Sequence, residues 1–250
     1  MSWRLKAPEG KPKGRKKKKP EADTGETLVQ KVSHSVIQFM RDQRLRVGDT
    51  LPSEAEIAVE LKVSRTVVRE AFGALSALKL IDVGSGRRAR VGKVDHSMMS
   101  LAFDHAVHTK QMSVQHIWDV RRALEVRTAE LAANRRTDEE AKAMLHHASG
   151  MRKSMNNRPE MVQHDIALHN LIAQATRNSL FHNIISSFGV VMLGAITNID
   201  QPNRENTELI VSLHERLAQA IADRNVSGAA AAMKDHFYTS LRVLVDAGFY

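Results

Sequence analysis

Four residues in the second half of the chain are of the types that bind divalent metal ions. Asp165 and His169 are four positions apart, so on a helix they share one face, about one turn from each other. His214 and His236 stand singly in two later segments, on the same faces as the neighbouring apolar residues. One carboxylate and three imidazoles suit zinc, manganese or nickel. Core histidines that are simply hydrogen-bonded would produce the same spacing, so both interpretations remain open.

Helices must position these residues. Apolar residues recur at helical spacing in segments that together cover most of the second half: 114–133, 138–155, 159–175, 180–196, 206–223 and 227–245. This pattern predicts a bundle of about six helices with short connections. Inside such a bundle an unpaired imidazole or carboxylate would be costly, and a shared metal ion would satisfy all four groups.

A second set of polar residues, within Leu51–Ala71, is of a kind that contacts DNA. Ser53 can cap a short helix, with Glu56 three positions later, and Ser64 can cap the next helix. The side chains expected to face outward from the first turns of that second helix are those of Arg65, Thr66 and Arg69. Two short helices with a tight turn, the second opening on arginines, form a helix-turn-helix. The alternative is a helix pair with a solvated basic face.

Basic charge is concentrated at the N-terminal end. Residues 1–25 hold nine lysines and arginines against three acidic residues, and residues 26–93 hold twelve against eight. The remainder holds sixteen against seventeen, although the whole chain carries +9. This distribution is the footprint of a nucleic-acid-binding end. Residues 1–25 cannot build a core, so we expect a disordered arm that either adds nonspecific affinity for phosphates or is only a solvated tail.

Composition excludes several classes of protein. The chain has no cysteine, which removes disulfides, thiolate metal sites and cysteine nucleophiles and suits a reducing cytoplasm. No apolar run approaches the roughly 20 residues that span a bilayer, and the basic N-terminus lacks the apolar stretch of a secretory signal. We therefore expect a cytoplasmic protein without a membrane partner.

The segment from Leu51 to Val91 resembles the winged helix-turn-helix of the GntR family of bacterial transcriptional regulators. The matching residues are Leu51-Pro52-Ser53-Glu54, Glu56-Ile57-Ala58, Val63-Ser64-Arg65-Thr66, Val68-Arg69-Glu70-Ala71 and Leu75. The resemblance implies that Ser64, Arg65, Thr66 and Arg69 contact DNA and that Gly84, Ser85 and Gly86 form the tip of a wing between two short strands. Ala55 departs from the family, which usually has an arginine there.

The helical region resembles the FCD effector domain of the FadR subfamily. Arg121-Arg122-Ala123-Leu124-Glu125 is similar to the family's Arg-x-x-Leu-Glu, and an Asp-x-x-x-His with two later histidines is typical of its metal site. The resemblance therefore assigns a divalent metal to Asp165, His169, His214 and His236. It implies that Arg121 pairs with the carboxylate of an effector, with Asn170 and Asn198 as further contacts. An ion pair with Glu125, four positions later, is the alternative role for Arg121.

Together these features predict a mainly α protein. We expect a disordered basic arm (1–25), a winged helix-turn-helix domain (26–93), a linker helix (94–112) and an antiparallel helical bundle for effector binding and dimerisation (113–250). The resemblance implies a homodimeric regulator, most often a repressor, that reads a near-palindromic operator and senses a small organic or sugar acid. The alternatives are a metal-dependent enzyme fused to a DNA-binding module and an architectural DNA binder. Against the enzyme, the sequence shows no nucleophile elbow and no phosphate loop.

Overall fold

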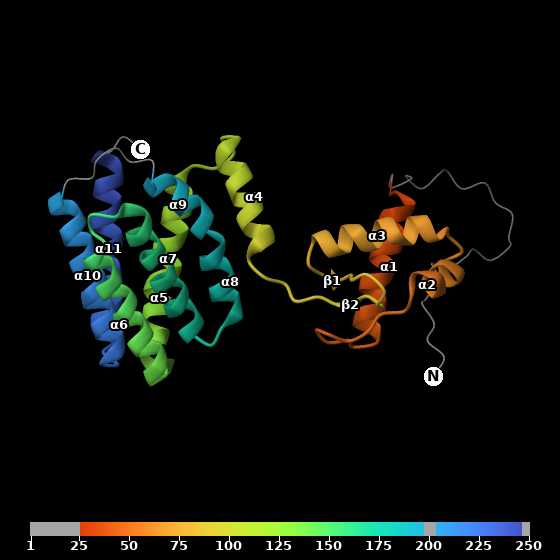
Figure 1. Ribbon diagram of the computed structural model, residues 1–250, viewed down its shortest axis with the longest axis horizontal. Helices are drawn as coiled ribbons and strands as arrows, with labels where there is room; N and C mark the ends of the chain where they lie inside the picture. The colour runs from red at the N-terminus through yellow and green to blue at the C-terminus, as the bar shows by residue number, and fades with distance from the viewer. Residues whose placement is uncertain (1–25, 198–203, 247–250) are drawn as a thin grey trace, which may run out of the picture. The chain divides into compact units, whose positions relative to one another are not determined.

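The computed structural model describes residues 26–197 and 204–246, and the chain divides into two compact units, 1–95 and 96–250 (Figure 1). The expected mainly α class is confirmed. Residues 1–25, where we expected a basic arm, and Asn198 lie outside the described residues.

The first unit is a small three-helix domain with a two-stranded hairpin. Its elements are α1 (Leu28–Asp42), α2 (Glu54–Leu61), α3 (Arg65–Ala77), β1 (Ile81–Asp82) and β2 (Arg90–Val91). Capping boxes at Thr27 and Ser53 start α1 and α2, and the Ser64 hydroxyl accepts a hydrogen bond from the backbone N–H of Val67 to start α3. The apolar faces of all three helices meet in one core that includes Val36, Leu51, Ile57, Val68, Phe72, Leu75 and Ile81.

The hairpin has the form of a wing. Its strands pair antiparallel, with Ile81 opposite Val91, and buried Ile81 joins its base to the core. Gly86 in the turn has a φ of +71°, a conformation that glycine adopts without strain. Gly92 lies so close to the preceding loop that a Cβ there would come within 2.4 Å of the carbonyl oxygen of Lys79. These glycines allow a tight connection between the wing and α3.

The second unit consists of helices only within the residues described. They are α4 (Ser97–His108), α5 (Val114–Arg135), α6 (Asp138–Lys153), α7 (Arg158–Ala175), α8 (Ser179–Ser187), α9 (Gly189–Thr197), α10 (Arg204–Ala222) and α11 (Val226–Asp246). The segment 180–196, expected as one helix, is two helices that break at Phe188. There the buried Phe188 ring stacks on Phe103 of α4, with ring centroids 5.4 Å apart, so α4 packs within this unit.

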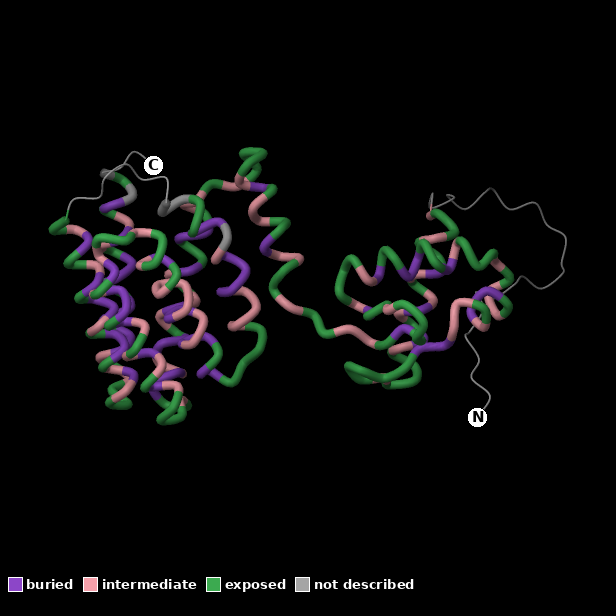
Figure 2. Tube along the Cα trace, viewed as in Figure 1, coloured by how far each residue is buried: buried purple, intermediate pink, exposed green. Residues whose placement is uncertain are grey.

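The long helices α5, α6, α7, α10 and α11 pack side by side as a bundle. Buried residues line their inward faces (Figure 2) and include Trp118, Leu168, Ile172, Leu217 and Phe237. None of the helices among the described residues is both long and apolar enough to cross a membrane. Side chains on the inward faces of α5, α7, α10 and α11 meet in the interior of this bundle.

Candidate metal centre and DNA-contacting helix

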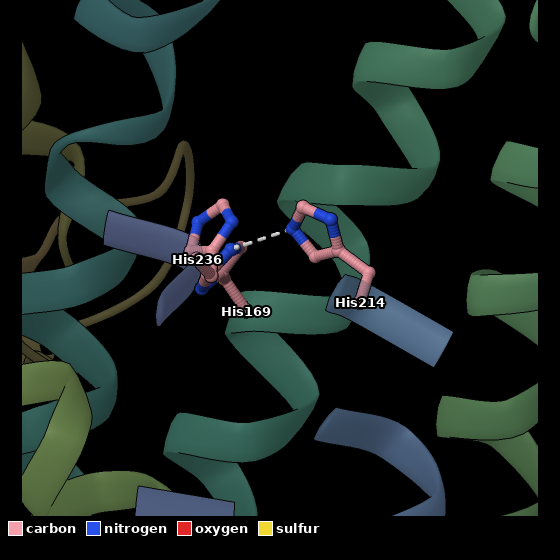
Figure 3. Close-up of side chains that lie close together, drawn as sticks. All are labelled: His169, His214 and His236. Atoms are coloured by element: carbon pink, nitrogen blue, oxygen red, sulfur yellow. Dashed lines mark hydrogen bonds between the residues drawn. The ribbon is translucent and has the colours of Figure 1, made fainter. Parts of the chain in front are cut away.

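Three histidines from three helices meet inside the bundle. His169 of α7, His214 of α10 and His236 of α11 offer ring nitrogens that all lie within 4.8 Å of one another. Their rings approach one another from different helices (Figure 3), and at most 3% of each residue is exposed. The spacing in sequence left open whether these residues converge, and the packing of the helices brings them together.

Asp165 completes the group at the end facing α10. Its Oδ1 lies 2.8 Å from Nε2 of His214 and 3.7 Å from Nε2 of His169, and the two Nε2 atoms are 3.4 Å apart. Three atoms at these separations lie on a circle with a radius of about 1.9 Å, close to the roughly 2.0–2.2 Å at which imidazole and carboxylate bind zinc. These three donor atoms therefore fit one divalent ion, and a ring nitrogen of His236 lies within 4.8 Å of those of His169 and His214.

The other ring nitrogens of these histidines have partners of their own. Nδ1 of His214 lies 2.8 Å from the carbonyl oxygen of Ile210 and donates to it, and Nδ1 of His169 donates to the Glu125 carboxylate. Nδ1 of His236 is 3.4 Å from the Ser240 hydroxyl. Outer partners of this kind fix the ring orientation and tautomer of metal-binding histidines. For His169 and His214 they leave Nε2 as the nitrogen that can bind an ion.

Burial and neighbouring charged groups have opposite effects on the pKa values of the two carboxylates in this interior. Burial alone would raise the pKa of Glu125, but Arg121 and His169 outweigh it and hold the pKa at about 2. Burial likewise opposes ionisation of Asp165, yet its contacts with the neighbouring imidazoles, first that of His214, hold the pKa of its carboxyl well below the ordinary value. Burial and the neighbouring imidazoles lower the pKa of His236 well below the ordinary value, so it is neutral at pH 7. Ionised carboxylates and a neutral imidazole are the forms that bind metal ions.

Arg121 lies next to this group, and the ion pair considered as its alternative role is present. Its Nε donates to Oε1 of Glu125 at 2.6 Å, and its guanidinium carbon lies 5.3 Å from the Trp118 ring and 5.6 Å from the Phe237 ring. Its two terminal nitrogens make no hydrogen bond to any residue that the structure describes. The ion pair therefore holds the guanidinium through Nε and leaves the planar fork for a carboxylate.

A cavity of about 240 Å³, counting its opening to solvent, adjoins both groups. Its lining consists of Arg121, Asp165, Ile166, His169, Asn170, Ile185, Gly189 and Met192. The oxygen of Asn170 accepts a hydrogen bond from Ser186 at 2.8 Å, which orients the amide in this wall. Of the three residues expected to contact an effector, this cavity brings Arg121 and Asn170 together.

In the first unit the expected DNA-contacting residues are exposed. Arg65, Thr66 and Arg69 face solvent at the start of α3, and the Arg69 guanidinium lies 3.2 Å from a carboxylate oxygen of Glu54. The hydroxyl of Ser64 caps α3. The backbone N–H groups at the N-terminus of α3 are exposed at the same place, where they can bind a phosphate.

The wing tip carries cations that the sequence analysis did not select. Ser85 and Gly86 are exposed and Gly84 is partly exposed, as expected for a tip, and Arg87 and Arg88 follow directly and are exposed. Arg87 pairs with Asp82 at 2.8 Å, and Arg88 lies 3.4 Å from Glu56 at the start of α2. The signal that could have found them is the run Gly-Arg-Arg-Ala-Arg at 86–90. The sequence likewise gives no signal for the contact of Glu125 with His169, because it joins residues 44 positions apart.

Two family models match the chain, one in each unit. Residues 28–91 match the gntR family of bacterial regulatory proteins, and residues 116–239 match the FCD domain. The Glc operon transcriptional activator of Escherichia coli is 26% identical over 232 residues, which cover 90% of this chain and 91% of that protein. The transcriptional repressor NanR of Escherichia coli is 25% identical over 215 residues, covering 84% and 81%.

A solved structure agrees with this fold. The GntR protein of Streptococcus agalactiae superposes with a TM-score of 0.62 at 22% identity, over 86% of this chain and 99% of that one. The family and these relatives are regulators of transcription, and nothing in the comparisons supports the enzyme alternative. The chain belongs to the GntR family of bacterial regulatory proteins and is a transcriptional regulator whose second unit is an FCD domain.

Proposed function

We propose that this regulator senses a small carboxylic acid, such as an organic or sugar acid, through a divalent metal held by Asp165, His169, His214 and His236. The observation that carries the proposal is the convergence of these donors beside Arg121 at one small cavity. Zinc suits a set of nitrogen and oxygen donors, and manganese or nickel can use the same ligands. An FCD domain is the effector-binding part of such a regulator, which agrees with this assignment.

The residues around the cavity have distinct roles in binding the acid. A divalent ion held by these four residues would supply positive charge for the carboxylate of the acid. The guanidinium of Arg121 binds the carboxylate with two parallel hydrogen bonds, for which its planar fork is suited. Asn170 offers an amide for a hydroxyl or keto oxygen, and Ile185 and Met192 cover the carbon skeleton. The polar metal ligands and the guanidinium would be wasted on the apolar tail of a long acyl chain, so the proposed effector is a small polar acid.

DNA reading belongs to the first unit. Ser64, Arg65, Thr66 and Arg69 contact the major groove from the start of α3, and Gly84, Ser85 and Gly86 bring the wing to the backbone, where Arg87 and Arg88 neutralise phosphates. The protein acts as a cytoplasmic homodimer, so its operator is near-palindromic. We propose repression as its mode, although the two relatives described act with opposite signs. A reporter gene behind the operator, with and without the regulator gene, decides the sign.

The effector acts by shifting a population. Binding of the acid changes operator affinity only if the acid has different affinities for the DNA-competent and incompetent arrangements of the dimer. The same coupling is reciprocal, so operator DNA must change the affinity for the acid by the same factor. This reciprocity provides a check that needs no knowledge of the motion itself.

A thermal-shift screen of small carboxylic acids tests the proposal. We expect an acid to raise the melting temperature of the metal-loaded protein and to lose this effect after treatment with a chelator. In Arg121→Met the shift should disappear, whereas the exposed Arg127→Met, on the same helix, serves as the matched control and should keep it. Acids that stabilise the chelated protein as well as the loaded one would contradict the role of the metal.

A further inference from the structure

Among the residues that the structure describes, Glu125 is the carboxylate that contacts both His169 of the metal group and Arg121. It is 1% exposed, its Oε1 accepts from Nε of Arg121, and its Oε2 accepts from Nδ1 of His169. Asp165, by contrast, faces the Nε2 atoms of the histidines. The two carboxylates therefore lie on opposite sides of the His169 ring.

We propose that Glu125 is a positioning residue that sets the tautomer of His169 and so creates the metal site. A neutral imidazole carries one proton, and the nitrogen without it is the one that can bind an ion. An ionised carboxylate can only accept, so Glu125 holds the proton on Nδ1 and leaves the lone pair of Nε2 directed at Asp165 and His214. The inference rests on the metal site proposed above.

Arg121 determines which way an amide at position 125 would be oriented. The Nε–H of an arginine is always a donor, and so the group that faces it must accept. In Glu125→Gln the amide oxygen is therefore drawn to Arg121, and the amide NH₂ is left facing Nδ1 of His169. The NH₂ can only donate, so it favours the tautomer with the proton on Nε2. That proton occupies the position from which His169 would bind the ion.

Other residues do not perform this role. The remaining contacts described for His169 are with Asp165 and His214 through Nε2, and with the rings of His236 and Phe237. None of these contacts supplies an acceptor for Nδ1. His214 obtains the same effect from the Ile210 carbonyl oxygen within its own helix, so a substitution at Glu125 leaves the tautomer of His214 unchanged.

The test measures zinc affinity by competition with a chromophoric chelator, using full-length wild type and Glu125→Gln. We expect a 10–100-fold loss of affinity, the usual effect of removing an outer partner of a metal-binding histidine. Glu130→Gln is the matched control. Glu130 lies on the same helix and pairs with Arg127 at 2.7 Å without contacting a ligand, so it should bind zinc as the wild type does. Equal affinity in wild type and Glu125→Gln would overturn the inference.

A second pair of variants tests the proposal in case Glu125→Gln does not fold. Glu125→Gln leaves Arg121 buried without a counter-charge, which can be strongly destabilising. The double variant Arg121→Met/Glu125→Met has no buried unpaired charge and no group at position 125 that accepts from Nδ1 of His169, and we compare it with Arg121→Met. If Glu125 positions His169, the double variant binds zinc more weakly than Arg121→Met at a temperature where circular dichroism shows all the proteins folded.

The tautomer can also be read directly from the metal-free protein. Long-range ¹⁵N–¹H spectra should show the proton of His169 on Nδ1 in wild type and on Nε2 in Glu125→Gln. The same tautomer in both proteins would refute the positioning role. If wild type binds no divalent metal at all, the metal site proposed above fails, while the tautomer measurement still decides what Glu125 does.

Discussion

Metal binding should stabilise the second unit by a predictable amount. A ligand that binds only the folded state, present at a hundred times its dissociation constant, adds about 2.7 kcal/mol to the free energy of unfolding. For a unit of the size of 96–250, each kcal/mol raises the melting temperature by about 2–4 °C. Zinc added to chelator-treated protein should therefore raise the melting temperature by roughly 5–11 °C.

His214→Ala isolates the contribution of the site to this shift. His214 is fully buried, and its Nε2 is within hydrogen-bonding distance of both Asp165 and His169, so the substitution removes the donor nearest to the carboxylate. If affinity falls a hundredfold, the same zinc concentration only equals the dissociation constant. The stabilisation then drops to about 0.4 kcal/mol, a shift of about 1–2 °C.

The assay is a melting curve at a series of zinc concentrations, repeated with manganese and nickel. His105→Ala is the matched control, because it removes an exposed imidazole from α4 and should keep the full zinc response. A wild-type melting temperature that none of the three metals changes would refute the reasoning. So would a shift in His214→Ala as large as that of wild type.

Four other outcomes are expected. Arg65→Ala should weaken operator binding by about 1–3 kcal/mol if it makes a bidentate base contact, and equal losses on operator and random DNA in a gel shift would assign it to phosphates. Ala55→Arg places a cation on an exposed position of α2 and should steepen the salt dependence of DNA binding by about one counterion, whereas an unchanged slope would show that this position does not reach a phosphate. Deletion of residues 1–22 should flatten that salt dependence without changing operator preference, and an unchanged slope would make the arm a bystander. Burial lowers the pKa of His236 in the folded protein, so the unfolded chain binds a proton on this imidazole more readily. The metal-free protein should therefore lose stability as the pH falls below the ordinary imidazole range. Denaturant titrations in which His236→Gln shows the same pH dependence as wild type would contradict this.

Local signals in the sequence were sufficient for most of the fold. Caps at Ser53 and Ser64 and the apolar spacing of the helices depend on contacts within a few residues, and the structure has helices at those places. The apolar pattern runs through Phe188 without interruption and so does not predict the break there, where the structure shows the Phe188 ring stacked on Phe103, far away in sequence. A continuous apolar pattern does not record such a contact.

The candidate site could also be predicted only in part from the sequence. By residue type and helical spacing, the sequence alone singled out Asp165, His169, His214 and His236, because a helix repeats its face every three to four residues. Only the tertiary structure decided that α7, α10 and α11 turn these faces to one point, and that Glu125 of α5 meets His169 there. The physical reason is that helix packing joins residues 22 or more positions apart. In addition, the ring nitrogen that faces the ion depends on which partner holds the other nitrogen.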